Sequence, residues 1–165
     1  MSTRLLTRSR LEPVLPWIST AARLLVAGVL LTAGALKVVD PATSVAAVRA
    51  YELLPEGLVS IVGWGLPFLE IALGLLLVAG LFTRQVAVAA GVLFLLFIVA
   101  VASAAARGLS IDCGCFGGGG EVAPGETRYT AEIIRDLGLL ALCGWLIWRP
   151  ASKLSLDSRG REDLQ

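Results

Sequence analysis

Residues 86–106 form an apolar run, VAVAAGVLFLLFIVAVASAAA, that contains no charged side chain. An α-helix needs roughly 20 predominantly apolar residues to cross the hydrocarbon core of a membrane, so this run predicts a membrane-spanning helix. Three more segments have a suitable length and composition, at 17–37, 58–82 and 130–148. The sequence therefore predicts an all-α fold, an integral membrane four-helix bundle.

These segments define one membrane domain over 17–148, which is flanked by polar ends. Residues 1–16 form a basic leader, expected on the anionic cytoplasmic surface of the membrane. Residues 149–165 are polar and lack an apolar period, so we predict a disordered tail. The first segment also fits a cleaved signal peptide, because AGA at 33–35 is typical of a cleavage site. The long leader and the direct passage into Lys37 favour a retained helix.

The composition limits the chemistry that the chain can perform. Hydrophobic residues make up 56% of it and charged residues 16%, whereas soluble domains carry about 25% charged residues. The sequence contains no histidine, which excludes Ser–His–Asp catalysis, His-ligated zinc and a proximal-His haem. A net charge of +1 gives no indication of nucleic-acid binding. Any chemistry must use thiols, carboxylates or a borrowed cofactor.

The distribution of Lys and Arg predicts the orientation of the helices. With four spans both chain ends share a side, and that side carries nine of the 14 Lys and Arg residues. Basic residues gather in cytoplasmic loops, so we predict cytoplasmic termini and an extracytoplasmic loop at 107–129. In the first outer loop, Asp40-Pro41 is a helix-start signal. A short amphipathic helix is expected there, ending before Pro55.

The second outer loop contains the pair Cys113-Gly114-Cys115. Disulfides form and persist outside the cytoplasm, and residues two apart can reach the Cα separation of roughly 4.4–6.8 Å that a disulfide needs. Closing so small a ring strains the peptide, and strained disulfides are the labile ones. The bond would also close almost no loop and so stabilise the fold little. The pair is therefore predicted to exchange electrons rather than to hold the fold together.

Other interpretations of the pair stay open at this point. Asp112 opposes thiolate formation, whereas Arg107 and Arg135 favour it. The pair could be an inert turn of small residues. It could also capture a soft ion such as Cu(I), since two thiolates alone cannot complete a four-coordinate zinc site. In that case a dimer could supply four sulfurs.

Glu70 lies near the middle of the second apolar segment, on one helical face with Gly63, Pro67 and Gly74. Small residues let helices approach closely, and intramembrane carboxylates are candidates for function. The alternative is a protonated carboxyl that bonds a neighbouring backbone or hydroxyl group. Lys37 has the opposite charge, but the helical rise places it roughly a third of the bilayer away. No pair between them is therefore expected.

The third cysteine, Cys143, lies about thirteen residues into the last segment. At that depth it cannot reach the loop pair. A free cysteine there behaves as a small apolar residue, so we predict that it packs in the bundle.

The order of these motifs resembles a known family. A first helix ends in GALKVVDP, a loop carries YELLP, a second helix carries LPFLEIALGLLLVAGLFTR, and RGLSIDCGCFGGG follows the third helix. This resembles the methylamine utilisation protein MauE family, a branch of the DoxX-like four-helix membrane proteins, over residues 19–149. The family is associated with maturation of the disulfide-rich small subunit of methylamine dehydrogenase, and more widely with extracytoplasmic thiol–disulfide metabolism.

The resemblance implies a multi-pass protein of the bacterial cytoplasmic membrane. It implies that Cys113 and Cys115 are the redox pair, and that Lys37, Asp40 and Glu70 form a supporting membrane site. The partner would be an extracytoplasmic thioredoxin-like or disulfide-containing protein. Quinone-linked disulfide generators with four-helix cores relay electrons between two cysteine pairs, whereas this chain has one pair.

The expected function is therefore thiol–disulfide exchange, as a component of an oxidoreductase system. A partner thiolate would attack the Cys113–Cys115 disulfide, and a membrane quinone near Glu70 or a separate carrier would reoxidise the pair. Electron flow in the opposite direction is equally compatible with the sequence. Two other classes compete: a small transporter or soft-metal-handling subunit that uses Glu70 and both thiols, and a membrane scaffold without catalysis.

Overall fold

The structure is a computed structural model of the 165-residue chain, and it describes residues 14–115, 118–123, 125–153 and 155–156. Its elements are helices α2 (Leu15–Val39), α3 (Pro41–Ala50), α4 (Glu56–Ala79), α5 (Thr83–Ala106) and α6 (Tyr129–Trp148), and strands β1 (Ile111–Asp112) and β2 (Gly120–Glu121). The mainly helical fold is confirmed, and the two-stranded hairpin adds a feature that the sequence did not predict. The predicted leader at 1–16 falls almost entirely outside the described residues.

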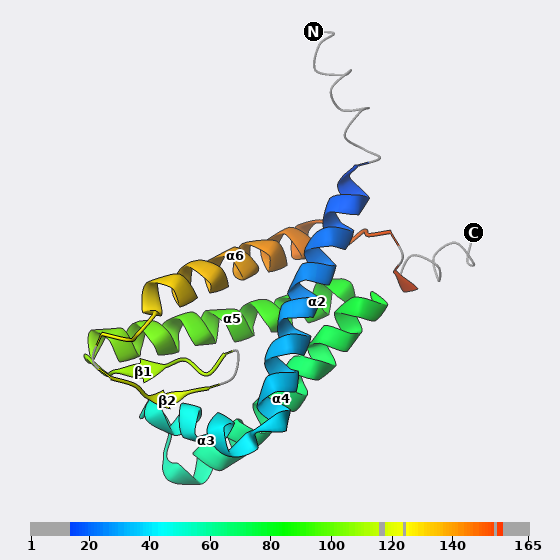
Figure 1. The fold of residues 1–165 in the computed structure, drawn as a ribbon. Coiled ribbons are helices and arrows are strands. Elements are labelled where there is room, and N and C mark those ends of the chain that lie inside the picture. The colour runs from blue at the N-terminus through cyan, green and yellow to red at the C-terminus, as the bar shows by residue number, and fades with distance from the viewer. Residues whose placement is uncertain (1–13, 116–117, 124, 154, 157–165) are drawn as a thin grey trace, which may run out of the picture.

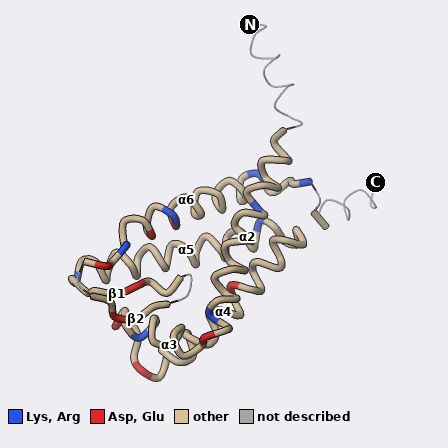
Figure 2. Tube along the Cα trace, in the orientation of Figure 1, with Lys and Arg blue, Asp and Glu red and all other residues tan. Residues whose placement is uncertain are grey.

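The long helices form two antiparallel pairs, α2 with α4 and α5 with α6, and the pairs cross each other (Figure 1). Helix α3 and the β1–β2 hairpin cover one end of the bundle, called here the hairpin end. The start of α2 and the residues after α6 lie at the opposite end, called here the tail end. Charged residues gather toward the hairpin end (Figure 2), so the two ends differ in chemistry.

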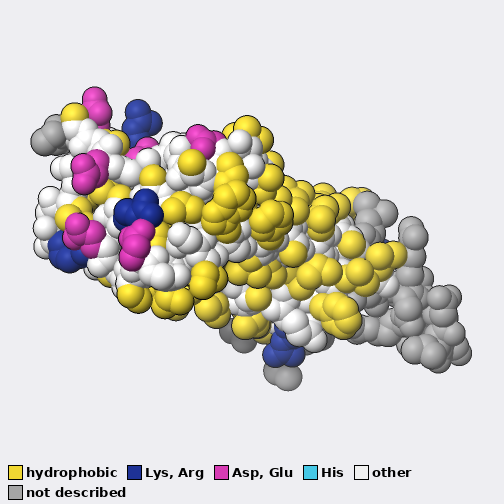
Figure 3. Space-filling view, turned by 90° about the horizontal axis from the view of Figure 1, so that it is seen from below, with side chains coloured by type: hydrophobic (Ala, Val, Ile, Leu, Met, Phe, Trp, Pro, Cys, Tyr) yellow, Lys and Arg dark blue, Asp and Glu magenta, His cyan; other side chains and the backbone are white. Residues whose placement is uncertain are grey.

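Three helices are long and apolar enough to cross a membrane, namely α2, α4 and α5. Their outward side chains are largely apolar, and they make up most of the visible middle of the molecule (Figure 3). Helix α6 has 20 residues and packs along α5, but its first turns carry Glu132, Arg135 and Asp136. The length and composition of these three helices are those of a membrane protein.

Glycines set the position of α2 against α4. A Cβ atom at Gly34 would lie 2.8 Å from the backbone oxygen of Pro67, and one at Gly74 would lie 2.7 Å from Leu31 Cγ. Small residues at such contacts let helix backbones approach closely. Because Gly34 near the end of α2 faces Pro67, the first turns of α4 extend beyond α2. Those turns pack against α3 instead, where Ser44 Oγ donates to the backbone oxygen of Gly63 at 2.9 Å.

The residues after α6 close the tail end of the bundle. Ser19 Oγ donates to the backbone oxygen of Arg149 at 3.0 Å, and Thr20 Oγ1 lies 3.1 Å from that of Lys153. Ser155 Oγ donates to the backbone oxygen of Gly80 at 3.2 Å. The carbonyls of Arg149 and Lys153 thus bond polar groups of α2, and the Ser155 hydroxyl bonds the residue that ends α4, within the segment for which a disordered tail is predicted. Residues 157–165 lie outside the described part of the chain.

Candidate functional site

The loop between α5 and α6 carries the two cysteines on a tight turn directly after β1. The strands pair antiparallel, with Ile111 opposite Glu121 and Asp112 opposite Gly120. Gly114 has a φ of 67°, and a Cβ atom there would lie 2.6 Å from Ala47 Cβ on α3. Glycine suits this position because it adopts positive φ without steric cost. The loop is thereby held against α3.

Side chains on both sides of the turn fix its backbone. Asp112 Oδ1 accepts from the backbone N–H of Gly114 at 2.8 Å. The Tyr129 hydroxyl donates to the backbone oxygen of Leu109 at 2.6 Å and accepts from the N–H of Ile111 at 3.1 Å. These bonds connect the loop to the start of α6, so the cysteines have a defined position relative to that helix.

The two loop cysteines are free thiols in close contact. The backbone N–H of Cys115 donates to Cys113 Sγ at 3.2 Å, and Cys115 Sγ lies 3.9 Å from the backbone oxygen of Cys113. Cys113 is half-buried, whereas the Cys115 side chain is 7% exposed. A reagent or protein approaching from outside would therefore meet Cys113 first.

The surroundings of the two sulfurs have opposite charge. Carboxylate oxygens of Asp112 and Glu132 lie with Cys113 Sγ in a group whose atoms are all within 4.8 Å of one another. A hydrogen bond with the Cys115 thiolate and burial raise the pKa of Cys113, and Glu132 adds to this. The same hydrogen bond, donated by Cys113, lowers the pKa of Cys115 against its burial, with support from the positive charges of Arg135 and Lys37. In the reduced pair Cys115 is therefore the thiol that loses its proton more readily, and Cys113 holds its proton more strongly.

Lys37 and Glu70 form a buried ion pair, with Lys37 Nζ 2.6 Å from Glu70 Oε1. Their side chains are 6% and 1% exposed, and the lysine also lies over the Phe97 ring. The prediction that these residues are too far apart is therefore wrong. It assumed that both helices end in the same plane, whereas α4 extends beyond α2. Lys37 therefore lies at the same height in the bundle as Pro67. Glu70 is one helical turn away along α4, and the lysine side chain is long enough to span that distance.

The ion pair belongs to a larger buried polar layer that reaches the thiols. Glu70, Arg135, Asp136 and Cys115 line one small void of about 10 Å³. Arg135 Nε donates to Asp136 Oδ1 at 2.8 Å. A void of this size holds a single water at most. The layer connects α2, α4, α6 and the cysteine loop, and it contains two acids and two bases.

Two of the predicted supporting residues lie elsewhere. Asp40 caps α3, accepting from the backbone N–H and the hydroxyl of Thr43 at 3.1 and 2.6 Å, and these bonds lower its pKa. Arg107 donates to the backbone oxygen of Tyr51 and lies 3.8 Å from a Glu52 carboxylate oxygen. Arg107 thus orients the segment after α3, and Arg135 supplies the positive charge near Cys115.

The first turns of α6 contribute Glu132, which was not predicted to be a site residue, and Asp136, which was expected to flank the cysteine loop or to anchor the helix at the interface. Glu132 and Asp136 are both buried and four residues apart, so they share one helical face. Two acids on the inward face of an apolar helix are a signal in the sequence, because such groups seldom enter a bundle without a partner. Tyr51 was also missed, and its hydroxyl lies 3.4 Å from the backbone oxygen of Cys113. Cys143 is fully buried in the bundle, as expected.

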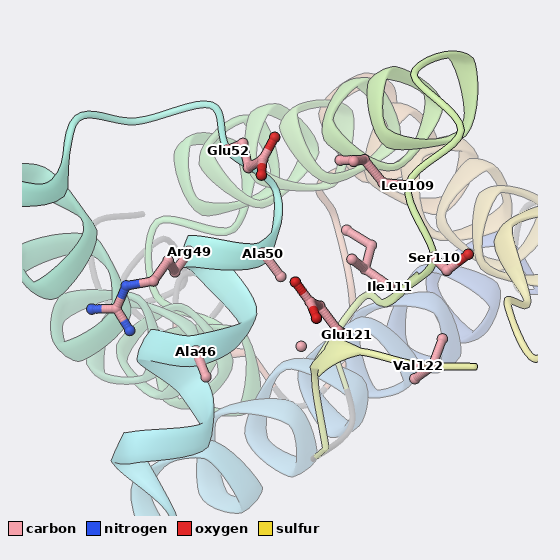
Figure 4. Close-up of a pocket in the computed structure, with 10 residues that line it drawn as sticks. Ala46, Arg49, Ala50, Glu52, Leu109, Ser110, Ile111, Glu121 and Val122 are labelled. Carbon is pink, nitrogen blue, oxygen red and sulfur yellow. The ribbon is translucent and has the colours of Figure 1, made fainter. Parts of the chain in front are cut away.

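Two cavities adjoin the loop. An apolar cavity of about 290 Å³ lies between α3, α4 and α5, and both Tyr51 and Cys113 form part of its wall. An open pocket of about 620 Å³ lies between α3 and the hairpin (Figure 4). In that view Glu121 points from the hairpin toward α3, whereas Arg49 points away from it. Cys113 therefore borders the apolar cavity, whereas neither loop cysteine lines the open pocket.

Comparison with known proteins gives one positive finding. A family model described as methylamine utilisation protein MauE matches residues 15–149, which is most of the chain. No curated protein and no solved structure gives a significant match. The match spans every helix and strand named above, including the cysteine loop and the buried polar layer.

Proposed function

Because this chain belongs to the methylamine utilisation protein MauE family, we propose that it is a membrane component of extracytoplasmic thiol–disulfide exchange. The observation that carries this proposal is the asymmetry of its two adjacent sulfurs. Cys113 is half-buried and has a raised pKa, whereas Cys115 is buried and has a lowered pKa, so Cys115 forms the better thiolate. A pair that differs in this way has one sulfur suited to attack by a partner and one suited to leave.

The exchange follows from these properties. In the oxidised pair, a partner thiolate attacks Cys113 Sγ, because Cys113 is the less buried of the two cysteines. The Cys113–Cys115 bond breaks, and Cys115 leaves as a thiolate, since a thiol of lower pKa leaves faster. A second partner thiolate then attacks its own sulfur in the mixed disulfide and displaces Cys113, which takes up a proton. The partner loses two electrons and gains a disulfide, and the pair gains both electrons.

The buried polar layer supports the leaving sulfur. Arg135 and Lys37 place positive charge near Cys115, and both lower the pKa of that thiol. Glu70 holds Lys37 at 2.6 Å, so the lysine keeps its position although it lies in an apolar bundle. Lys37, Glu70 and Arg135 are therefore positioning residues, and the two cysteines are the catalytic residues.

A membrane quinone fits the structure at a different place from the one expected. The void next to Glu70 measures about 10 Å³ and cannot take a quinone ring. The apolar cavity of about 290 Å³ has Cys113 and Tyr51 in its wall and approaches the volume of ordinary ligand pockets. When bound there, a quinone would supply a two-electron acceptor to the reduced pair. The apolar residues of α3, α4 and α5 would hold its ring, and Tyr51 would lie at its polar edge.

The topology proposed here has α6 as a fourth span and both termini in the cytoplasm. Helix α6 has 20 residues, which give a length of about 30 Å at 1.5 Å per residue. Its charged residues are confined to the first two turns, at the hairpin end. The Lys and Arg distribution then puts the hairpin end outside the membrane of a bacterial cell. The thiol pair would face thioredoxin-like or disulfide-containing partners.

Trapping the thiols in intact membranes with an alkylating mass tag tests the proposal. In a Cys143→Ala background, the pair should be protected from the tag until a thiol donor is added, and both sulfurs should then react. Brief exposure of the oxidised protein to glutathione should give a mixed disulfide on Cys113, identified by peptide mass spectrometry. A pair that stays fully reduced under every quinone and thiol condition contradicts the redox function. A Cys113→Ser/Cys115→Ser variant that matures partner disulfides normally favours a scaffold.

A further inference from the structure

The carboxylates beside Cys113 take no part in the exchange described above. Glu132 is 9% exposed, and its Oε2 atom has no hydrogen-bond partner among the described residues. A buried acceptor without a partner destabilises the fold. Asp112 lies beside Glu132, so two carboxylates and the Cys113 thiol lie close together in the cysteine loop.

The spacing of these groups suits a metal ion. One oxygen of Asp112, one of Glu132 and Cys113 Sγ all lie within 4.8 Å of one another. In a tetrahedral zinc site, bonds of about 2.0–2.3 Å place the ligand atoms about 3.5 Å apart. The three groups therefore need to move together by about 1 Å only. Two carboxylates also repel each other, and a divalent cation between them removes that repulsion.

We propose that Asp112, Cys113 and Glu132 form a binding site for a divalent cation of the zinc class, present only when the cysteine pair is reduced. The mixed donor set favours this class, because thiolates bind Zn²⁺ and carboxylates complete its coordination without histidine. The ligand set differs from a capture of soft ions by two thiolates. It uses one sulfur, and Cys115 stays outside it.

Binding couples the metal to the redox state of the loop. Zn²⁺ displaces the proton of Cys113 and forms a sulfur–metal bond, so one proton is released for each ion bound. When Cys113 is bonded to Cys115 in the disulfide, it has no thiolate to offer, and the site loses its sulfur ligand. By linkage, the cation stabilises the reduced pair, and oxidation releases the cation. The loop would thereby bind zinc when the cysteine pair is reduced and release it when the disulfide forms.

A cobalt titration tests the ligand set without any disulfide chemistry. The full-length protein in nanodiscs carries Cys115→Ser and Cys143→Ala, so that Cys113 is the only thiol. Added Co²⁺ should give a thiolate-to-metal charge-transfer band, and Zn²⁺ should remove it. Adding Glu132→Gln should weaken Co²⁺ binding at least tenfold. The matched control Glu121→Gln changes an exposed carboxylate of the same hairpin and should leave the affinity unchanged.

The site would be overturned if the Cys115→Ser protein gave no band, or if the Glu132→Gln variant bound Co²⁺ with equal affinity. It would also be overturned if the band appeared only in protein that retains Cys115. The last of these would support capture by two thiolates. Because the titrated protein cannot form the disulfide, its outcome is independent of whether the pair exchanges electrons.

A second measurement uses the wild-type pair and does not depend on the fold of a variant. Above the dissociation constant, each tenfold rise in free Zn²⁺ should raise the midpoint potential of the two-electron couple by about 30 mV, because the ion stabilises the reduced pair. A potential that does not change with Zn²⁺ contradicts the proposal. If the pair cannot be oxidised at all, the thiol–disulfide function fails, and the cobalt titration still decides the metal site.

Discussion

Helix α2 buries a basic side chain near each of its ends, and the two are satisfied in different ways. Toward the hairpin end, Lys37 is paired with the Glu70 carboxylate at 2.6 Å. Toward the tail end, Arg23 is 1% exposed, and its Nη2 lies 3.5 Å from the backbone oxygen of Lys153. A carboxylate can gain or lose a proton, whereas a backbone carbonyl cannot.

Because of this difference, the hairpin end of α2 contributes to thiol reactivity, whereas its tail end contributes to stability only. At the hairpin end the ionisable groups form a layer that includes Cys115. Removing one charge from this layer therefore shifts the pKa of the Cys115 thiol. At the tail end, Ser19, Thr20 and Ser155 bond fixed backbone dipoles. We therefore expect substitutions at the hairpin end to alter both stability and thiol reactivity, and substitutions at the tail end to alter stability alone.

The largest effect is expected from Lys37→Leu. Removing one partner of a buried ion pair leaves the other charge unpaired, and this costs about 3–5 kcal/mol. The free energy of unfolding, measured in mixed micelles by denaturant titration, should fall by that amount. The rate of Cys115 alkylation should also fall, because a positive charge near its sulfur is lost.

The double substitution Lys37→Leu/Glu70→Leu is the matched control. It removes both charges together and should recover most of the lost stability, because no unpaired charge remains. A double variant that is as unstable as the sum of its single changes would mean that the ion pair contributes little to this end of α2.

The next effect concerns the glycine that sets the position of α2 on α4. In Gly34→Ala the new Cβ atom would lie 2.8 Å from the backbone oxygen of Pro67, and overpacking of this kind costs about 1–3 kcal/mol. Gly28→Ala meets nothing within 4 Å on the same helix, so it should gain about 0.5–1 kcal/mol from helix propensity. Thermal unfolding of both variants measures the difference. Equal midpoints would contradict the close contact.

Arg23→Met tests the tail end. The substitution keeps a long side chain but removes the guanidinium that donates to the backbone oxygen of Lys153, and a hydrogen bond of a charged group contributes about 1.5–3 kcal/mol. Unfolding measurements should detect this loss, and the pH profile of Cys115 alkylation should stay as in the wild type. A shifted pH profile would contradict the claim that the tail end of α2 does not affect the reactivity of Cys115.

The smallest effect is a change in pH dependence. A hydrogen bond from Cys113 lowers the pKa of Cys115 below its ordinary value of 9.0, and the positive charge of Arg135 lowers it further. Arg135→Gln removes that charge, so the thiolate becomes less favourable and the midpoint of the alkylation pH profile should rise. Peptide mass spectrometry of Cys115 after pulsed alkylation measures the midpoint. Arg128→Gln, an exposed residue at the start of α6, should leave it unchanged.

The helices themselves could be predicted well from the sequence. The expected segments at 17–37, 58–82, 86–106 and 130–148 correspond to α2, α4, α5 and α6 within three residues at each end. The short helix after Asp40 and the inward face of Glu70 are confirmed as well. These features depend on apolar length, helical spacing and capping, which are properties of consecutive residues.

The site could be predicted only in part. The cysteine pair was identified because its motif is contiguous, and Asp112 and Arg135 were expected to act on it. Asp40 and Arg107 were also expected to support the site, yet they bond other groups. Glu132 was missed: it comes nineteen residues after Cys113 and nevertheless lies beside it, because the loop folds back onto the start of α6.

The order of residues along the chain is enough to predict apolar helices, the lack of imidazole chemistry and a pair of thiols in one loop. Which charged groups meet depends on how the helices pack against one another. Lys37 reaches Glu70 because glycine contacts place α4 beyond the end of α2. Hydropathy sums over neighbours along one helix, whereas an ion pair depends on the relative axial position of two helices, and that position is set by close packing between them.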